Sequence, residues 1–508
     1  MPFINSIISW LNVKRLHQID LFKKYPIDVQ RETLIKLLRR AENTEWGRQY
    51  DYKSIKTIKE YKKRVPLNDY ESLKKYVIRL RHGEQNLLWD TDIKWFAKSS
   101  GTSSDKSKFI PVSRDAFEDC HFRAGKDVLA IYTENNPNTN IIKGKMLVLG
   151  GSHQINNFSN ESYYGDLSAV LIQNLPFWAE FIRTPRSAIA LMAEWDKKID
   201  KMASATIKRN ITNIAGVPSW TLVLIKHILE KTGKKSLLDV WPNLELFVHG
   251  GVSFIPYKEQ YKKLIPSEKM NYLETYNASE GFFAIQDDSA SDDMLLMLDY
   301  GIFYEFIPLE KIDDKNPKTI SLDEVELNKN YALVISTNSG LWRYIIGDTI
   351  KITSKYPFKI KITGRIKNFI NAFGEELIID NAENAIKIAC EKTGSEVREY
   401  TAAPIYIDDD QKGGHEWLFE FEKKPGNPEY FTEVLDNALK SLNSDYEAKR
   451  YKNMTLDMPK ITILKDGIFY QWLKEKGRLG GQNKIPRLAN ERKYVEELLA
   501  INDKMKKK

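Results

Sequence analysis

One short segment places the strongest constraint on what this chain can fold into. It reads KSSGTSSDKSKFIP at residues 98–111, and it follows the apolar run Trp95-Phe96-Ala97. Two apolar runs around small polar residues predict a β-hairpin whose tip is rich in hydrogen-bond donors. Backbone N–H groups, hydroxyls and lysines together suit a polyphosphate. The candidate phosphate-binding residues are Ser99, Ser100, Gly101, Thr102, Ser103 and Lys108.

The segment differs from the Walker phosphate loop, which has a second glycine directly before Lys-Ser/Thr and a helix after it. Here Asp105 precedes Lys106, and a strand-like run follows. The same composition is also typical of a solvated hairpin tip. Taken alone, the segment therefore leaves nucleotide binding and a plain surface turn open.

Composition narrows the class of protein. A chain of 508 residues exceeds one hydrophobic core and predicts two or three domains. The net charge of +8 is spread along the chain, with one dense basic run at 504–508, so nucleic-acid binding is not favoured. Only Cys120 and Cys390 are present, which fits a reducing, cytoplasmic location without disulfides. No apolar run approaches a membrane span, and Met1–Leu11 is interpreted as a docking helix.

Several predicted strands end in residues that could bind a ligand or take part in a reaction. The strand at 244–248 runs into His249-Gly250-Gly251, where a flat ring or a phosphate can approach the backbone; His249 is interpreted as a packing residue that could alternatively be a base. The strand at 272–278 ends in a turn with Ser279 and Glu280, and a carboxylate beside a hydroxyl is a natural Mg²⁺ ligand. Asp348 closes the run 341–348, where its carboxylate can accept from two ribose hydroxyls.

An aromatic-rich stretch at 158–181 and a helix that starts at Pro218 favour either an apolar substrate pocket or ordinary core packing. The candidate pocket walls are Tyr163, Tyr164 and Trp220. The histidines never fall at a metal-binding helical spacing, which argues against a zinc hydrolase.

The pattern changes near Thr363. After it, helices at 380–390 and 431–442 alternate with strands at 402–407 and 417–421, which predicts a small α+β unit with its own core. We therefore expect an α/β fold with two domains: residues 1–363 with mixed β-sheets flanked by helices, and residues 364–508 as a small mobile α+β domain. Lys484 lies on a glycine-flanked loop of the second domain, where it could reach a distant site or simply lie on the surface.

Taken in order, these segments resemble the auxin-responsive Gretchen Hagen 3 family of acyl-acid amido synthetases, within the adenylate-forming superfamily. The resemblance covers the chain from about residue 10 to its end. The segments that carry it are 99–108, 276–280, 340–348, 364–367 and 482–487.

The resemblance implies an ATP- and Mg²⁺-dependent ligase whose large domain forms the adenylate. A carboxylate would attack the α-phosphate of ATP, and an amine, usually an amino acid, would then attack the acyl-AMP. The implied roles are Ser99, Ser100, Thr102 and Lys108 for the phosphates, Ser279 and Lys484 for the α-phosphate, Glu280 for Mg²⁺, Gly251 and Val252 beside the adenine, and Asp348 and Arg365 for the ribose. Gly101, Ser103 and Tyr276 complete the implied nucleotide site.

Two alternatives stay open. An acyl-CoA ligase would share the adenylation motifs and use a thiol acceptor, and a nucleotide-binding protein without catalysis would bind ATP and release no pyrophosphate. The expected partners are a small carboxylic acid and an amine; we expect no nucleic acid, no membrane and a monomer.

Overall fold

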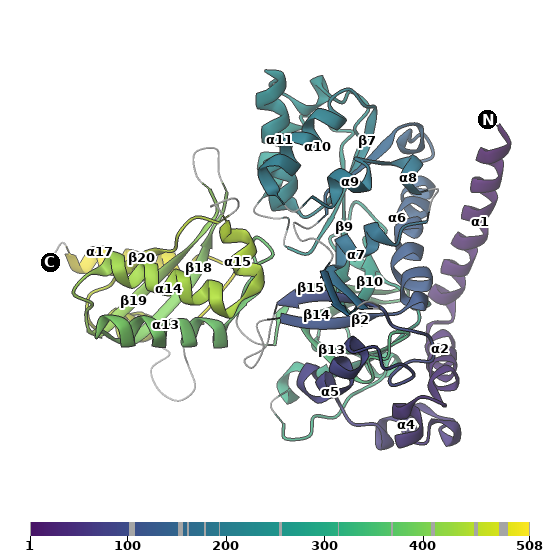
Figure 1. Cartoon of the computed structure of the whole chain (residues 1–508), viewed down its shortest axis with the longest axis horizontal. Coiled ribbons are helices and arrows are strands. Elements are labelled where there is room, and N and C mark those ends of the chain that lie inside the picture. Colours follow the sequence, from purple (N-terminus) through teal and green to yellow (C-terminus); the bar gives the residue numbers. More distant parts are fainter. Residues whose placement is uncertain are drawn as a thin grey trace.

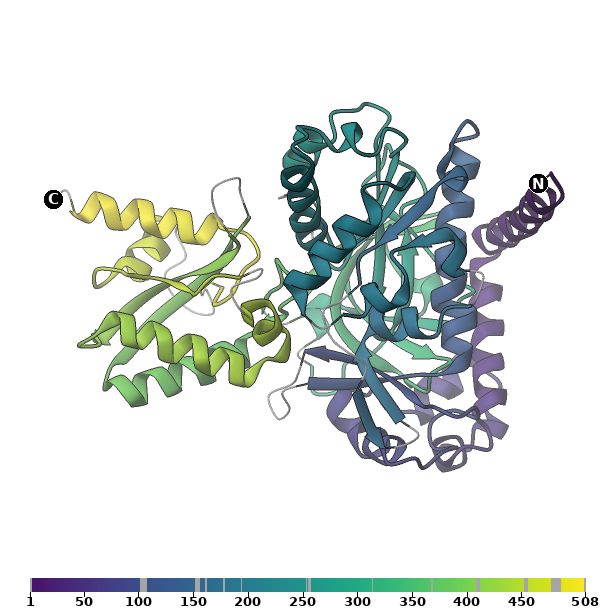
Figure 2. The ribbon, with the colours of Figure 1, turned by 45° about the horizontal axis from the view of Figure 1, so that its top comes forward.

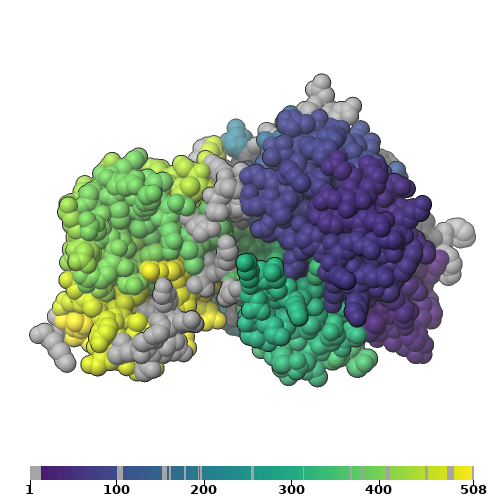
Figure 3. Space-filling model, turned by 90° about the horizontal axis from the view of Figure 1, so that it is seen from below, coloured from purple at the N-terminus to yellow at the C-terminus, as the bar shows by residue number. Residues whose placement is uncertain are grey.

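The computed structural model describes residues 2–506, apart from 101–106, 151–155, 160–161, 177–178, 193, 253, 255–256, 313, 367–368, 408–411, 452–455 and 477–485. The chain forms a large lobe and a smaller one, with the C-terminal residues in the smaller lobe (Figures 1 and 3). This arrangement agrees with the predicted fold class. No helix within the described residues combines the length and apolar character needed to cross a membrane.

A large mixed sheet organises the large lobe. In the described part of the chain it has eleven strands in the order β12-β13-β14-β15-β11-β10-β9-β8-β7-β3-β6. They are β3 (Lys145–Val148), β6 (Arg183–Thr184), β7 (Ile211–Gly216), β8 (Leu246–Gly250), β9 (Asn271–Ala278), β10 (Gly281–Ile285), β11 (Met294–Leu296), β12 (Ile302–Pro308), β13 (Asn330–Thr337), β14 (Tyr344–Lys355) and β15 (Phe358–Arg365). The strands from β6 to β9 are parallel and those from β9 to β12 antiparallel.

A smaller sheet, ordered β2-β1-β5-β4, lies in the same lobe. Its strands are β1 (Trp95–Ser100), β2 (Ser107–Val112), β4 (Asn156–Ser159) and β5 (Ser162–Asp166). The antiparallel pairing of β1 with β2 confirms the predicted hairpin.

Helices surround both sheets (Figure 2). They are α1 (Pro2–Lys24), α2 (Pro26–Ala41), α3 (Glu45–Gln49), α4 (Ile58–Arg64), α5 (Tyr70–Arg81), α6 (Phe122–Asn135), α7 (Leu167–Gln173), α8 (Ala179–Ile182), α9 (Ser187–Ala190), α10 (Trp195–Thr206), α11 (Pro218–Thr232) and α12 (Lys258–Leu264). Local sequence explains several ends: Asp69 caps α5 through the backbone N–H of Ser72, and Pro218 occupies the first turn of α11.

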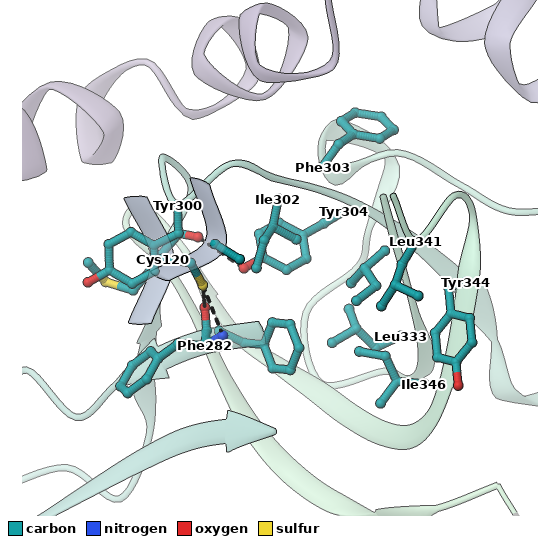
Figure 4. Close-up of a cluster of buried hydrophobic side chains, with 14 of the residues drawn as sticks. Cys120, Phe282, Tyr300, Ile302, Phe303, Tyr304, Leu333, Leu341, Tyr344 and Ile346 are labelled. Carbon is teal, nitrogen blue, oxygen red and sulfur yellow. Dashed lines mark hydrogen bonds between the residues drawn. The ribbon is translucent and has the colours of Figure 1, made fainter. Parts of the chain in front are cut away.

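The core of the large lobe lies between β12–β14 and the helices that cover them (Figure 4). The run Ile302–Pro308 is almost continuously apolar because both faces of β12 are covered. A π-helix, η2 (Ala116–His121), precedes α6, and its Cys120 Sγ lies 3.2 Å from the backbone nitrogen of Phe282. Tyr300 lies beside Cys120, and Tyr344 lies at the other end of the same cluster beside Leu341 and Ile346 (Figure 4).

The small lobe is an α+β unit built on the sheet β18-β19-β20. Its elements are β16 (Phe369–Ile370), β17 (Leu377–Ile378), α13 (Ile379–Thr393), β18 (Glu396–Ile405), β19 (Gly414–Lys423), α14 (Pro428–Leu442), α15 (Ser444–Arg450), β20 (Lys460–Ile463), α16 (Ile468–Glu475) and α17 (Lys493–Lys506).

The two lobes touch through specific contacts. Tyr257 Oη donates a hydrogen bond to the Ala372 carbonyl (2.8 Å), and Ser107 Oγ donates to Ser444 Oγ (2.9 Å). β15 continues to Arg365, two residues past the expected boundary. The division at residue 363 stays our proposal.

Candidate functional site

The β1–β2 hairpin fixes the position of two candidate phosphate ligands. Ser99 pairs with Lys108, and directly opposite residues project to the same face of a sheet. Ser100 pairs with Ser107 at the end of the hairpin nearest its connecting loop. Gly101, Thr102 and Ser103 lie outside the described residues, so the role of the hairpin tip in phosphate binding stays a prediction.

The second motif forms a tight hairpin turn between β9 and β10. Ala278 pairs with Gly281, which leaves Ser279 and Glu280 as the turn residues. Burial raises the pKa of Glu280 to about 7; Lys108 lowers it, and Glu376 and Asp348 raise it further. A carboxylate in this environment gains from a nearby cation.

Asp348 lies at the centre of a hydrogen-bonded group. Tyr276 Oη donates to its Oδ2 at 2.6 Å, and Arg365 Nε donates to its Oδ1 at 2.7 Å. Arg365 also forms an ion pair with Glu376, with 3.3 Å between Nη1 and Oε2. A carboxylate has about four acceptor positions, so one bond on each oxygen leaves room for two ribose hydroxyls.

The end of β8 brings bare backbone close to the next strand. A Cβ on Gly250 would lie 2.4 Å from the Thr275 carbonyl oxygen, so only glycine fits there. Gly251 has a φ of +81°, and its carbonyl accepts from Asn371 Nδ2 at 3.3 Å. Val252, the other residue implied at the adenine, follows directly and is buried.

His249 packs rather than titrates. Its ring stacks on Phe254 with 4.2 Å between centroids, and burial lowers its pKa to about 3. A histidine that stays neutral throughout the physiological range has no charge to change there, which agrees with the packing interpretation.

The three candidate pocket walls do not share one surface. Tyr163 and Tyr164 are adjacent on β5 and therefore project to opposite faces: Tyr163 packs on Trp95, and Tyr164 stacks on Phe158 with 4.1 Å between centroids. Trp220 is 7% exposed and donates from Nε1 to the Phe373 carbonyl at 3.1 Å. Their contact with an acyl substrate stays a proposal.

Three charged residues that the sequence patterns did not select lie beside these groups. Glu376 forms an ion pair with Arg365, as described above, and its neighbours in the sequence carry no signal of this role. Asp445 and Lys449 come from α15, and Lys449 Nζ lies 4.0 Å from the centre of the Trp220 ring. Asp445 and Lys449 come close to the site only because the two lobes pack together. The sequence around them therefore contains no motif that could have identified them.

The described residues contain no group of three or more His, Cys, Asp and Glu side chains that could hold a metal ion. Glu280 is a single carboxylate whose pKa is raised by burial and by neighbouring negative charges. Such a residue fits a cation that takes its other oxygen ligands from a nucleotide.

Lys484 lies outside the described residues. Its delivery to the nucleotide stays a prediction.

Comparison with known proteins identifies the family whose domain models match this chain. The family model described as the GH3 family N-terminal domain matches residues 15–270, the GH3 family central domain matches 295–365, and the GH3 family C-terminal domain matches 380–493.

Curated relatives of similar length are found in Arabidopsis thaliana. Indole-3-acetic acid-amido synthetase GH3.3 is 24% identical over 94% of this chain and 92% of its own length. The 4-substituted benzoates-glutamate ligase GH3.12 is 22% identical over 86% of this chain and 88% of its own.

Two solved structures share the fold. GH3.15 acyl acid amido synthetase superposes with a TM-score of 0.60 at 18% identity, covering 96% of this chain and 95% of that one. A 2-hydroxyisobutyryl-CoA ligase superposes with a TM-score of 0.52 at 14% identity, covering 96% and 93%.

Proposed function

Since the chain belongs to the GH3 family, we propose that it is an ATP-dependent acyl-acid amido synthetase. It converts a carboxylic acid to acyl-AMP and then transfers the acyl group to an amine, most simply an amino acid. The observation that carries this proposal is the Asp348 carboxylate, held by Tyr276 and Arg365 beside Glu280 and Lys108.

In the first half-reaction, an oxygen of the substrate carboxylate attacks the α-phosphorus of ATP. The bond from that phosphorus to the bridging oxygen breaks, and pyrophosphate leaves with the electron pair. Lys108 and the hydroxyls of Ser99, Ser100, Thr102 and Ser103 balance the phosphate charge, with Gly101 allowing the loop to approach. Ser279 and Lys484 act at the α-phosphate.

The nucleoside is held by residues of the central strands and of the segment that follows β8. Gly251 and Val252 adjoin the adenine, and Tyr276 completes the nucleotide site. Asp348 accepts from the ribose hydroxyls, and Arg365 keeps the Asp348 carboxylate oriented through the 2.7 Å bond from Nε. Holding both reactants in place supplies much of the rate because the reaction needs no protein nucleophile.

Glu280 is the residue that would hold Mg²⁺, together with phosphate oxygens of ATP. The ion, when bound, would neutralise phosphate charge as pyrophosphate forms.

In the second half-reaction, the amine nitrogen attacks the acyl carbon, and AMP leaves. We propose that residues 364–508 form a mobile domain that moves relative to residues 1–363. We also propose that the protein works as a monomer in the cytoplasm. Domain movement would let one site admit first ATP and then the amine.

The test is acid-dependent exchange of radiolabelled pyrophosphate into ATP across a panel of aromatic and aliphatic acids, with and without Mg²⁺. We expect exchange with at least one acid. Mass spectrometry of the products with amino acids, or with coenzyme A, separates an amide from a thioester. Absence of both exchange and AMP across the panel would remove the adenylation proposal, and a thioester as the sole product would make the protein an acyl-CoA ligase.

A further inference from the structure

Helix α15 lies on the side of the small lobe that faces the large one (Figure 1). Asn443 holds its first turn: Asn443 Oδ1 accepts from the backbone N–H groups of Asp445 (2.9 Å) and Tyr446 (2.8 Å). Asn443 Nδ2 donates to the Glu376 carbonyl at 3.1 Å, and Ser444 contacts Ser107 of the hairpin. The helix is therefore anchored to both lobes beside the nucleotide site.

Asp445 and Lys449 are four residues apart on α15 and share one face of the helix. Lys449 Nζ lies over the Trp220 ring of the large lobe. Asp445 is close enough to Lys98 and Asp166 for their charges to affect its pKa. Lys98 and Asp166 are register partners on β1 and β5, so this face of α15 meets the two central strands of the smaller sheet.

The environment of Lys449 is unusual for a lysine. The residue is 6% exposed. Within the described residues, its ammonium forms neither a hydrogen bond nor an ion pair. The Trp220 ring supplies a cation–π contact, and Trp220 is itself fixed by its bond to Phe373. A buried ammonium usually has an anionic partner, because removing it from water is costly. The Asp445, Asp166, Glu375 and Glu376 carboxylates act on this ammonium through their charges without bonding to it, and an anionic ligand would supply the direct partner.

The Asp445 carboxylate also has no hydrogen-bond partner among the described side chains. One face of α15 thus presents a carboxylate and an ammonium, each open to a further partner. A zwitterionic α-amino acid carries the complementary pair, an ammonium and a carboxylate, close together.

We propose that Asp445 and Lys449 form the acceptor subsite, in which Lys449 binds the carboxylate of an α-amino acid and Asp445 receives a proton from its ammonium group. This inference rests on the proposed function and names the residues that would select the second substrate. Glu376 connects the two regions, since it forms an ion pair with Arg365 and its charge acts on both Glu280 and Asp445.

The proposed step balances as follows. The acceptor ammonium gives one proton to the Asp445 carboxylate and becomes a neutral amine. Its nitrogen forms a bond to the acyl carbon, and the bond from that carbon to the phosphate oxygen breaks, so AMP leaves with the electron pair. The nitrogen gives its second proton to water, and Asp445 returns its own to solvent before the next cycle.

The pH dependence follows from the groups around Asp445. Burial raises its pKa to about 7; Glu376 and Asp166 raise it as well, whereas Lys449 and Lys98 lower it. Only the carboxylate form accepts a proton, so the rate of amide formation should fall as the pH drops below about 7.

The experiment separates the two half-reactions in Asp445→Asn, Lys449→Met, Lys449→Arg and a control, Glu447→Gln, from the exposed side of the same helix. Pyrophosphate exchange measures adenylation. Amide yield from synthetic acyl-AMP, made from the acid chosen by the exchange assay, measures transfer to each of the twenty common amino acids and to their α-amides. Circular dichroism and thermal melting check that each variant folds.

We expect Lys449→Met to raise the KM for amino acids roughly 10–100-fold, because one charge-assisted hydrogen bond is lost. The KM for the α-amides, which lack the carboxylate, should stay near the control value, and Lys449→Arg should restore much of the affinity for amino acids. Asp445→Asn should lower kcat by roughly 10²-fold and remove the fall in rate below pH 7.

Three results would overturn the subsite: equal effects of Lys449→Met on amino acids and on α-amides, an unchanged pH profile in Asp445→Asn, or losses of exchange as large as those of transfer. The last result would instead assign the pair to the contact between the lobes. Failure of the proposed function is distinct, because the unmodified protein would then show no acid-dependent exchange at all.

Discussion

Asp348 illustrates how one carboxylate can serve both the fold and a ligand. It is 9% exposed, and its two oxygens accept from Tyr276 and Arg365. These two donors orient the carboxylate before any nucleotide arrives, so a ribose meets acceptors that are already in place. Preorganisation of this kind reduces the entropy lost on binding.

We predict that Asp348→Ala weakens ATP binding by about 2–4 kcal/mol, since two charge-assisted bonds to the ribose are lost. Calorimetry with ATP and with 2′,3′-dideoxy-ATP measures this directly. The unmodified protein should bind the dideoxy nucleotide more weakly than ATP, and Asp348→Ala should bind the two about equally. If Asp348→Ala still binds ATP more tightly than the dideoxy nucleotide, the ribose hydroxyls are bound by residues other than Asp348.

Glu280 should make stability depend on pH. Its pKa is about 7 in the folded protein against 4.5 as the ordinary value, so the folded state holds an extra proton between those limits. The free energy of unfolding therefore falls as the pH rises from 4.5 to 7, and the loss is complete above 7.

Glu280→Gln cannot ionise and should escape this loss. Without Mg²⁺ or ATP, we expect it to be more stable than the unmodified protein by about 1–2 kcal/mol at pH 8, after allowance for partial exposure, and by almost nothing at pH 4.5. Thermal melting across this range measures the difference, with the exposed Glu326→Gln as a control. A difference that does not vary with pH would contradict the raised pKa.

Individual site residues divide into those with a local signal and those without one. Glu280 follows β9 and lies in a turn, where sequence alone could select it. Asp348 was expected to close a strand, but it lies inside β14, where it pairs with Arg365 of β15. Glu376, Asp445 and Lys449 have ordinary neighbours in the sequence. Their chemistry depends on which residues the other lobe brings close, and a local pattern contains no information about that.

The sequence predicts where helices and strands occur more readily than it predicts which strands pair with one another in the sheet. The hairpin at 95–112, the helix after Pro218 and the strand before Gly250 all follow from local apolar patterns and turn residues, and all are present. The apolar stretch from Met294 to Ile307 instead divides into β11 and β12. β11 pairs with β10 and β15, whereas β12 forms the sheet edge beside β13, because the chain turns at Gly301 with a φ of +68°.

Trp220 joins helix α11 to the small lobe, and its substitution tests that contact. We predict that Trp220→Ala lowers the free energy of unfolding by about 3–5 kcal/mol, the usual cost of emptying a tryptophan site. Trp220→Phe should cost less, since it keeps an aromatic face for Lys449 and loses the bond to the Phe373 carbonyl. Denaturant unfolding measures both values.

The same variants test whether Trp220 contacts the acyl substrate. Its burial is already explained by Phe373 and Lys449, so we expect the order of acid preference in pyrophosphate exchange to stay unchanged. A reordered preference in Trp220→Ala, with Trp220→Phe intermediate, would instead support a position in the pocket wall.

The molecule as a whole joins its lobes through a continuous apolar cluster. Trp220 and Tyr257 of the large lobe belong to the same buried group as Phe373 and Trp417 of the small one. The change of pattern near Thr363 predicted a second unit, but not this shared surface, since the relative placement of two lobes depends on contacts between distant segments. Charged residues at this contact, Lys449 and Glu376 among them, are the ones through which we propose that the small lobe takes part in the chemistry.

Two lysines of the small lobe should therefore act in different half-reactions. Lys484 belongs to the motif implied at the α-phosphate, and Lys449 to the proposed acceptor subsite. We predict that Lys484→Ala slows pyrophosphate exchange by roughly 10²-fold or more, because one preorganised positive charge is lost as the carboxylate attacks. Amide formation from supplied acyl-AMP should stay close to that of Lys474→Ala, an exposed lysine of α16. Lys449→Met should show the opposite pattern. Equal losses in both assays for Lys484→Ala would mean that Lys484 is structural or acts in both steps. The hypothesis that Lys484 is delivered to the site only for adenylation would then be wrong.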